Sequence, residues 1–126
     1  MSETVNVRYM VGDVQACVDW YIGHFGFKEA LNAAPAFASL DRGAMRLLLS
    51  GEKSSAGRPM PDGRVPEPGG WNRFQVIVED IAAEVARLRG EGVAFRNEIL
   101  SGPGGSQILA EDPAGNLVEL FQPAGR

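Results

Sequence analysis

Several features that mark particular classes of protein are scarce in this chain of 126 residues. It has one cysteine, Cys17, so no disulfide can form within it, and we expect the protein to work in the reducing cytoplasm. No apolar run is long enough to span a membrane, and the opening stretch MSETVNVRYM is too polar for a secretion signal. Acidic residues outnumber basic ones, 16 to 12, which argues against nucleic acid as the main partner because phosphate binding needs a basic face. The sequence therefore predicts a cytoplasmic protein whose partner is neither a membrane nor a nucleic acid.

What remains is the composition of an ordinary globular protein. The hydrophobic fraction is 44% and the charged fraction is 22%, and the length suits one domain with a single core. The 16 glycines and 8 prolines gather at recognisable turns instead of forming low-complexity tracts. We therefore expect an ordered structure along almost the whole chain.

The first half of the chain begins with a strand, a helix and a hairpin. Residues 5–11 alternate as a strand, Asp13 is placed to cap a helix, and Gly26 is placed to end it. The i, i+3, i+4, i+7 apolar stripe of this helix comprises Val14, Cys17, Val18 and Tyr21. Residues 37–50 then read as a hairpin. Cys17 lies on the apolar stripe, so we expect it in the core and not as a nucleophile.

The second half repeats this plan. Residues 72–78 form a strand, Asp80 caps the next helix, and residues 106–121 form the closing hairpin. Matching VGDV to VEDI gives an offset of 67 residues, and matching Gly43 to Gly115 gives 72. Such a repeat predicts an α+β fold made of two βαβββ modules in one domain over residues 1–126.

The predicted boundaries place module one at residues 4–50, a linker at 51–70 and module two at 71–123. The linker contains four prolines and five glycines and is long for a compact domain. Such connections are either functional lids or disordered linkers, and we expect a partly ordered crossover here.

Strand alternation separates an apolar face from a mixed face in each module. Arg73, Gln75 and Ile77 share the mixed face of the strand at 72–78. Glu119 lies between apolar neighbours in the last strand, and a carboxylate on such a surface needs a partner or a function. By the two offsets, Asn6 corresponds to Arg73 and Leu47 corresponds to Glu119. Both modules are therefore expected to direct these positions into one shared concavity.

Three stretches resemble the vicinal oxygen chelate superfamily, which includes glyoxalase I, extradiol dioxygenases, and fosfomycin and bleomycin resistance proteins. They are VGDVQACVDWYIGHFGF (11–27), VIVEDIAAEVARLRGEGV (76–93) and EDPAGNLVELFQP (111–123), of which the last is the most specific. The resemblance implies two βαβββ modules whose curved mixed sheets enclose a cleft, in a chain that often forms a homodimer.

The resemblance also implies where a metal would be held. The four ligand positions of metal-dependent members correspond to Asn6, Leu47, Arg73 and Glu119. Those members carry His or Gln at the first and third positions and Glu at the second and fourth, and only Glu119 agrees with that pattern. Leu47 has no donor atom, and the guanidinium of Arg73 stays protonated and cannot coordinate a cation. We therefore expect no metal and no cofactor.

Arg73 then stands where a metal ion would otherwise face Glu119. Two interpretations remain: the two side chains form an ion pair that only neutralises itself, or the pair also holds an anionic or carbonyl group of a ligand. Trp71 is either a ligand-stacking residue or a packing residue. The predicted ligand-binding residues are Asn6, Met10, Leu47, Trp71, Arg73, Gln75 and Phe121, and Glu119 is the predicted catalytic residue.

The functional prediction is a metal-independent small-molecule-binding protein, similar to bleomycin resistance proteins. The alternative is a glyoxalase-like lyase or isomerase in which Glu119 is the general base and Arg73 stabilises charge. The sequence leaves open whether the protein is an enzyme. It predicts a small-molecule ligand and a homodimer.

Overall fold

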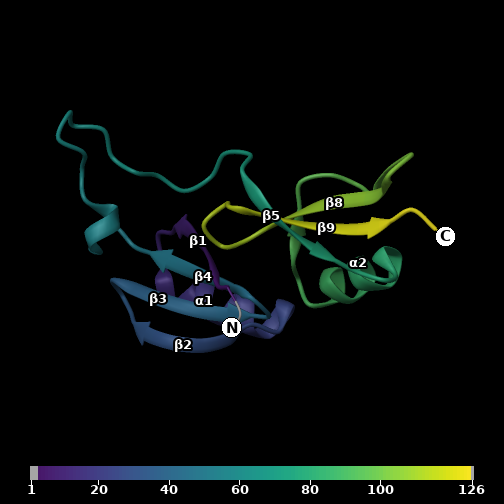
Figure 1. Cartoon of the computed structure of the whole chain (residues 1–126), viewed down its shortest axis with the longest axis horizontal. Helices are drawn as coiled ribbons and strands as arrows, with labels where there is room; N and C mark the ends of the chain where they lie inside the picture. The colour runs from purple at the N-terminus through teal and green to yellow at the C-terminus, as the bar shows by residue number, and fades with distance from the viewer. Residues whose placement is uncertain (1–2, 126) are drawn as a thin grey trace. The chain divides into compact units, whose positions relative to one another are not determined.

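The computed structural model describes residues 3–125 and has the predicted α+β fold, with two sheets and two helices. The chain divides into two compact units, with the boundary between Gly69 and Gly70 (Figure 1). Neither helix in the described range is long and apolar enough to cross a membrane.

Unit 1 holds the first βαβββ module and the segment that follows it. Its elements are β1 (Val5–Met10), α1 (Val14–Phe25), β2 (Lys28–Ala33), β3 (Phe37–Arg42), β4 (Met45–Ser50) and the short 3-10 helix η1 (Ser55–Gly57). The strand order is β1-β4-β3-β2, in which β1 runs parallel to β4 and the other neighbours are antiparallel. The exposed strand β2 completes the module.

Unit 2 repeats this topology. Its elements are β5 (Arg73–Ile77), α2 (Ile81–Gly90), β6 (Ala94–Phe95), β7 (Leu100–Gly102), β8 (Gly105–Glu111) and β9 (Leu117–Pro123). The order is β5-β9-β8-β6, β5 is parallel to β9, and β7 also pairs with β8. The strand that corresponds to β2 is thus divided into β6 and β7.

Both helices begin, and α1 also ends, as the sequence predicts. The side chains of Asp13 and Asp80 accept hydrogen bonds from Ala16 N and Ala83 N, each at 3.0 Å. Such caps satisfy backbone donors that have no partner within the helix. Gly26 ends α1 with φ 67°, a left-handed angle that glycine adopts without steric cost.

Each helix covers the apolar face of its own sheet. In unit 1, Arg42 Nε donates to the carbonyl of Phe25 at the end of α1, which places the helix on the side of Leu40. In unit 2, Gln122 Oε1 accepts from Ile81 N at 2.8 Å, which places α2 on the side of Leu120. The fully buried side chains include Tyr21, Leu40, Leu47, Leu49, Leu88, Ile108 and Leu120. Cys17 is fully buried, as predicted. The opposite side of each sheet is called its helix-free face below.

The register corrects one predicted correspondence between the modules. Leu47 is fully buried and pairs with Leu40 on the side that α1 covers. Its neighbour Leu48 pairs with Arg8 on the helix-free face of unit 1, as Glu119 pairs with Gln75 in unit 2. Leu48, and not Leu47, is therefore the counterpart of Glu119.

The error came from the lengths of the two hairpin turns. In unit 1, two residues, 43–44, connect β3 and β4. In unit 2, a hydrogen bond from Asp112 N to Asn116 O closes a longer turn over residues 113–115. Matching the turn glycines ignored this extra residue, and a slip of one residue moves a side chain to the other face of a strand.

The connection over residues 51–69 contains local structure. Ser54 accepts from Gly57 N at 3.1 Å and donates to the carbonyl of Gly51 at 2.6 Å, which builds η1. A tight turn follows, in which Met60 N donates to the carbonyl of Arg64 and Gly63 N donates to the carbonyl of Met60.

Candidate functional site

The helix-free face of unit 2 carries a buried carboxylate with two donors. Arg73 Nε lies 2.9 Å from Glu119 Oε1, and Gln75 Nε2 lies 2.7 Å from Glu119 Oε2. Glu119 is only 7% exposed. The predicted ion pair is present, and each oxygen of the carboxylate accepts one hydrogen bond.

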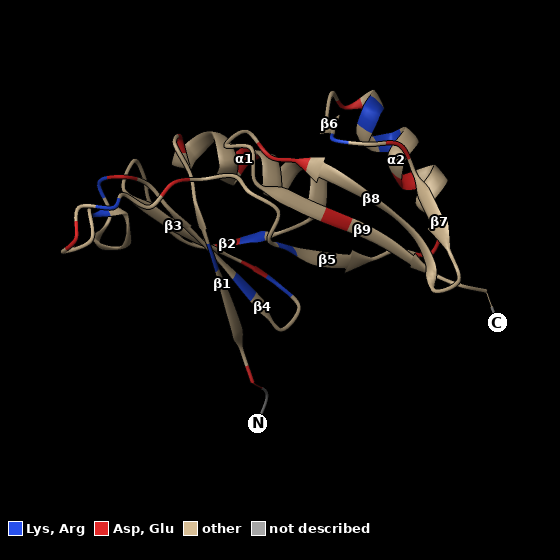
Figure 2. Ribbon diagram, turned by 90° about the horizontal axis from the view of Figure 1, so that it is seen from above, with Lys and Arg blue, Asp and Glu red and all other residues tan. Residues whose placement is uncertain are grey.

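Strand pairing brings these three residues together. In the parallel pair of β5 and β9, Arg73 pairs with Leu117 and Gln75 pairs with Glu119. Alternation along β5 turns Arg73 and Gln75 to the same side, so both reach the carboxylate that β9 presents between them. Figure 2 shows the acidic segment of β9 beside β5. Two adjacent strands therefore fix the positions of these three side chains.

Arg73 has donor capacity left for a ligand. Its Nη1 donates to the carbonyl of Trp71 at 3.2 Å, and within the described part of the chain its Nη2 makes no hydrogen bond. The side chain of Arg73 is 29% exposed, compared with 9% for that of Glu119. A guanidinium that is held by a carboxylate and remains partly exposed can donate to an anionic or carbonyl oxygen.

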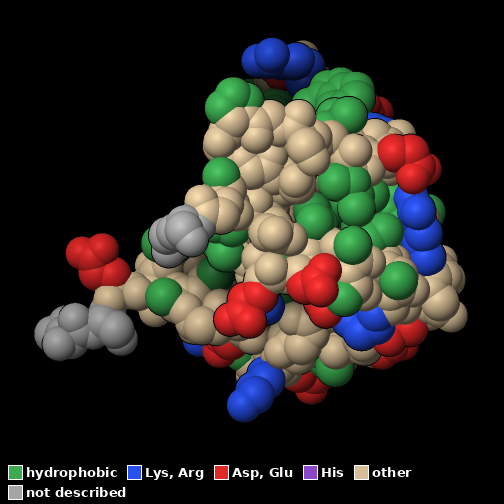
Figure 3. Space-filling model, turned by 90° about the vertical axis from the view of Figure 1, so that its right-hand side faces the viewer, with side chains coloured by type: hydrophobic (Ala, Val, Ile, Leu, Met, Phe, Trp, Pro, Cys, Tyr) green, Lys and Arg blue, Asp and Glu red, His purple; other side chains and the backbone are tan. Residues whose placement is uncertain are grey.

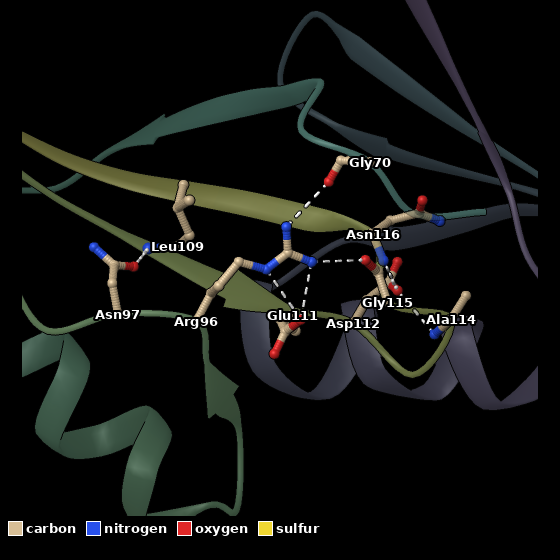
Figure 4. Close-up of polar contacts among 9 residues, drawn as sticks. All are labelled: Gly70, Arg96, Asn97, Leu109, Glu111, Asp112, Ala114, Gly115 and Asn116. Atoms are coloured by element: carbon tan, nitrogen blue, oxygen red, sulfur yellow. Dashed lines mark hydrogen bonds and ion pairs between the residues drawn. The ribbon is translucent and has the colours of Figure 1, made fainter.

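The side chain of a second arginine, Arg96, contacts the first residue of unit 2, Gly70. Arg96 Nη2 lies 2.9 Å from Glu111 Oε2, Nη1 donates to the carbonyl of Gly70 at 3.1 Å, and Nη2 also reaches that of Gly115 at 3.4 Å (Figure 4). The guanidinium carbon lies 4.6 Å from the centroid of the Trp71 ring. This cation–π contact orients Trp71, which is 65% exposed.

We expect replacement of Arg96 by glutamine to loosen the turn before β9. The bonds from Arg96 to the carbonyls of Gly70 and Gly115 would be lost, so amide hydrogen exchange at Gly115 and Asn116 should become about tenfold faster. Arg89→Gln, which removes an exposed ion pair with Glu98, is the matched control. Equal exchange rates in both variants would contradict the role given to Arg96.

The far end of the same face is apolar. Ile77 pairs with Phe121, and Phe121 pairs with Gln107, which pairs with Leu100 on the next strand. Ile77 and Leu100 are 58% and 59% exposed. More generally, hydrophobic side chains lie beside charged ones on the side of the molecule that Figure 3 shows. The helix-free face of unit 2 therefore combines a charged anchor with apolar surface.

The predicted ligand residues divide between the two units. Unit 2 holds Trp71, Arg73, Gln75, Glu119 and Phe121, all on or next to the helix-free face. In unit 1, Asn6 is exposed on the helix-free face and Met10 lines a small pocket beside Val11 and Val65, whereas Leu47 lies in the core. The predicted placement of Leu47 on the same face as Asn6 is therefore wrong.

The sequence did not place Arg96 and Glu111 in a second ion pair. Arg96 follows the short strand β6, and its backbone N–H donates to Leu109 O of β8. Alternation in VAFRN could have placed the side chains of Phe95 and Arg96 on opposite faces of one strand. The pairing of Arg96 with Glu111, however, depends on the register of β6 with β8. No cluster of three or more His, Cys, Asp or Glu side chains suited to a metal ion occurs within residues 3–125.

Comparisons with known proteins agree with this architecture. Residues 4–120 match the model of the Glyoxalase/Bleomycin resistance protein/Dioxygenase superfamily. TnmS3, an antibiotic binding protein from Streptomyces sp. CB03234, has 25% sequence identity, coverage of 98% of both chains and a TM-score of 0.73. Lactoylglutathione lyase from Agrobacterium tumefaciens has 21% identity, coverage of 97% of this chain and 94% of that one, and a TM-score of 0.73. A superfamily member from Sphaerobacter thermophilus DSM 20745 has 23% identity, coverage of 97% and 98%, and a TM-score of 0.75. No curated protein sequence matches the chain.

Proposed function

The chain belongs to the Glyoxalase/Bleomycin resistance protein/Dioxygenase superfamily, and from this membership we propose that it is a metal-independent small-molecule-binding protein anchored by Arg73 and Glu119. The observation that carries the proposal is the 2.9 Å contact between Arg73 Nε and Glu119 Oε1. The permanently charged guanidinium of Arg73 thus already pairs with Glu119, the carboxylate that corresponds to a metal ligand in metal-dependent members of the superfamily.

The residues at these positions do not fit a divalent metal ion. A protonated guanidinium beside the carboxylate repels a second cation, and it has no lone pair with which to coordinate one. Asn6 and Leu48, at the corresponding strand positions of unit 1, offer one amide and no further donor. These residues favour binding through hydrogen bonds and apolar contact.

The proposed ligand carries an oxygen-rich polar group and an apolar body. Arg73 would donate to an anionic or carbonyl oxygen, while Phe121 and Ile77 would contact the apolar part. The similarity to TnmS3, which its description calls an antibiotic binding protein, supports sequestration of a small molecule as the role.

The alternative, a lyase or isomerase with Glu119 as general base, has weaker support. Each oxygen of Glu119 already accepts a hydrogen bond, from Arg73 or from Gln75, and the side chain is only 9% exposed, so little of the carboxylate is open to a substrate. A general base must face the proton that it removes. Binding without turnover is therefore the preferred function.

The proposal is tested by ligand-induced thermal stabilisation. The native protein is screened against a panel of antibiotics and small organic acids, and Arg73→Gln is screened in parallel. We expect at least one compound to stabilise the native protein, and we expect the variant to bind it about tenfold to a hundredfold more weakly because one charge-assisted hydrogen bond is lost. Arg89→Gln is the control, since its guanidinium pairs with the exposed Glu98.

Two results would count against this function. Undiminished stabilisation of Arg73→Gln would remove Arg73 from the binding site. Turnover of a glutathione hemithioacetal that depends on bound nickel or zinc would favour the alternative.

We further propose that the protein is a cytoplasmic homodimer. Superfamily membership supports the dimer, and the single cysteine suits a reducing compartment. Light scattering coupled to gel filtration should give the mass of two chains.

A further inference from the structure

Unit 1 contains a pocket that the proposed function does not use. It has a volume of approximately 440 Å³ and is lined by Arg8, Ala36, Phe37, Lys53, Ser54 and Ser55. Two of these side chains are cationic and none is acidic. All six residues belong to unit 1, so the pocket is a property of that unit alone.

A buried hydroxyl orients the arginine of this pocket. Arg8 Nη1 donates to Ser50 Oγ at 2.8 Å, and Ser50 is fully buried at the end of β4. Ser50 also pairs with Phe37 of β3, which brings the apolar wall of the pocket next to the guanidinium. Because one nitrogen is held by the protein, Arg8 loses less conformational freedom when it binds a ligand.

Neither cation of the pocket has an ion-pair partner among the described residues. Elsewhere on the helix-free face of unit 1, Arg46 pairs with Asp41 at 2.8 Å, and that hydrogen bond holds the pKa of Asp41 below its ordinary value. Arg8 and Lys53, by contrast, form no salt bridge with any carboxylate in residues 3–125. Two cations without counter-charges in an acidic protein favour an anionic ligand.

The remaining lining residues indicate which other group the anionic ligand carries. Ser54 is committed to η1 through Gly51 and Gly57, and Ser55 also lines the pocket. Phe37 and Ala36 supply apolar surface on the other side. The volume exceeds what one inorganic oxyanion fills, so an apolar group can enter together with the acid.

We propose that this pocket binds a small organic anion, a carboxylate or phosphate ester that carries an apolar ring. The acid group lies between Arg8 and Lys53, and the ring contacts Phe37. All residues of this pocket belong to unit 1 and those of the Arg73–Glu119 anchor belong to unit 2, so variants can test this proposal independently of the proposed function.

The test uses phenyl phosphate, benzoate and phenol as probes in ¹H–¹⁵N NMR titrations of the full chain. The two anions should shift the amide signals of residues 36–37 and 53–55 with saturation, and neutral phenol should not. Lys53→Gln and Arg8→Gln should each weaken phenyl phosphate binding about tenfold. Higher ionic strength should weaken binding by the native protein as well.

Lys28→Gln is the matched control. Lys28 is an exposed lysine of β2 that pairs with Asp41, four residues along β3 from Phe37, so the variant removes the same charge outside the pocket. It should bind phenyl phosphate as the native protein does. Equal weakening by Lys28→Gln and Lys53→Gln, or shifts spread over other residues, would overturn the proposal, as would the absence of saturation. Lys53 is exposed, so its variant keeps the test decisive even if Arg8→Gln perturbs folding.

Discussion

Replacing Gly105 with alanine is expected to lower the free energy of unfolding of unit 2 by about 2–4 kcal/mol. Gly105 opens β8 with φ 146°, a conformation that side chains rarely adopt. A Cβ atom there would overlap the carbonyl oxygen of Gln122 and lie 2.9 Å from Cζ of Phe121. The backbone of β9 cannot move away without breaking its pairing with β8, so both strain and steric overlap contribute.

Gly102→Ala provides the matched control for this prediction. Gly102 pairs with Gly105 across the turn between β7 and β8, yet a Cβ atom there would have no neighbour within 4 Å. Urea unfolding, followed by tryptophan fluorescence, should show a clear loss for Gly105→Ala and a change of less than about 1 kcal/mol for Gly102→Ala. Similar losses in both variants would mean that general glycine entropy, and not the contact with Gln122, is responsible.

The second large effect is expected from substitutions at the Arg73–Glu119 pair, which distinguish its contribution to stability from its contribution to binding. Arg73→Met should destabilise unit 2 by about 2 kcal/mol, because Glu119 stays buried and keeps only the hydrogen bond from Gln75. Adding Glu119→Leu removes the buried charge. The double variant should therefore recover most of the lost stability, since apolar residues of similar volume often replace a buried ion pair without cost.

Binding should not recover in the double variant. If the pair anchors a ligand, Arg73→Met/Glu119→Leu should be folded and nearly as stable as the native protein, while the compound that stabilises the native protein most should no longer shift its melting temperature. Retained binding would show that the pair has a structural role only. Failure of the second substitution to restore stability would show that Glu119 contributes through contacts other than the one with Arg73.

Some features of this protein were predictable from the sequence, whereas others depended on the register of the strands. The capping roles of Asp13 and Asp80 and the αL glycine after α1 were predictable because they depend on a few consecutive residues. The contact between Arg73 and Glu119 was also predictable, because alternation placed each side chain on a mixed face and the family resemblance matched both to ligand positions of one metal site. The prediction for Leu47 was wrong because the register of β4 depends on the length of its hairpin turn.

The sequence by itself determined the two-module architecture and the faces of the strands, including those that carry Arg73 and Glu119. These features follow from local periodicity, which a single chain records directly. The tertiary structure alone decided that Leu48 and not Leu47 corresponds to Glu119, that Arg96 binds Glu111 and stacks on Trp71, and that Arg8 is held by Ser50. Each of these contacts joins residues distant in the chain, and strand register and turn length set their distances.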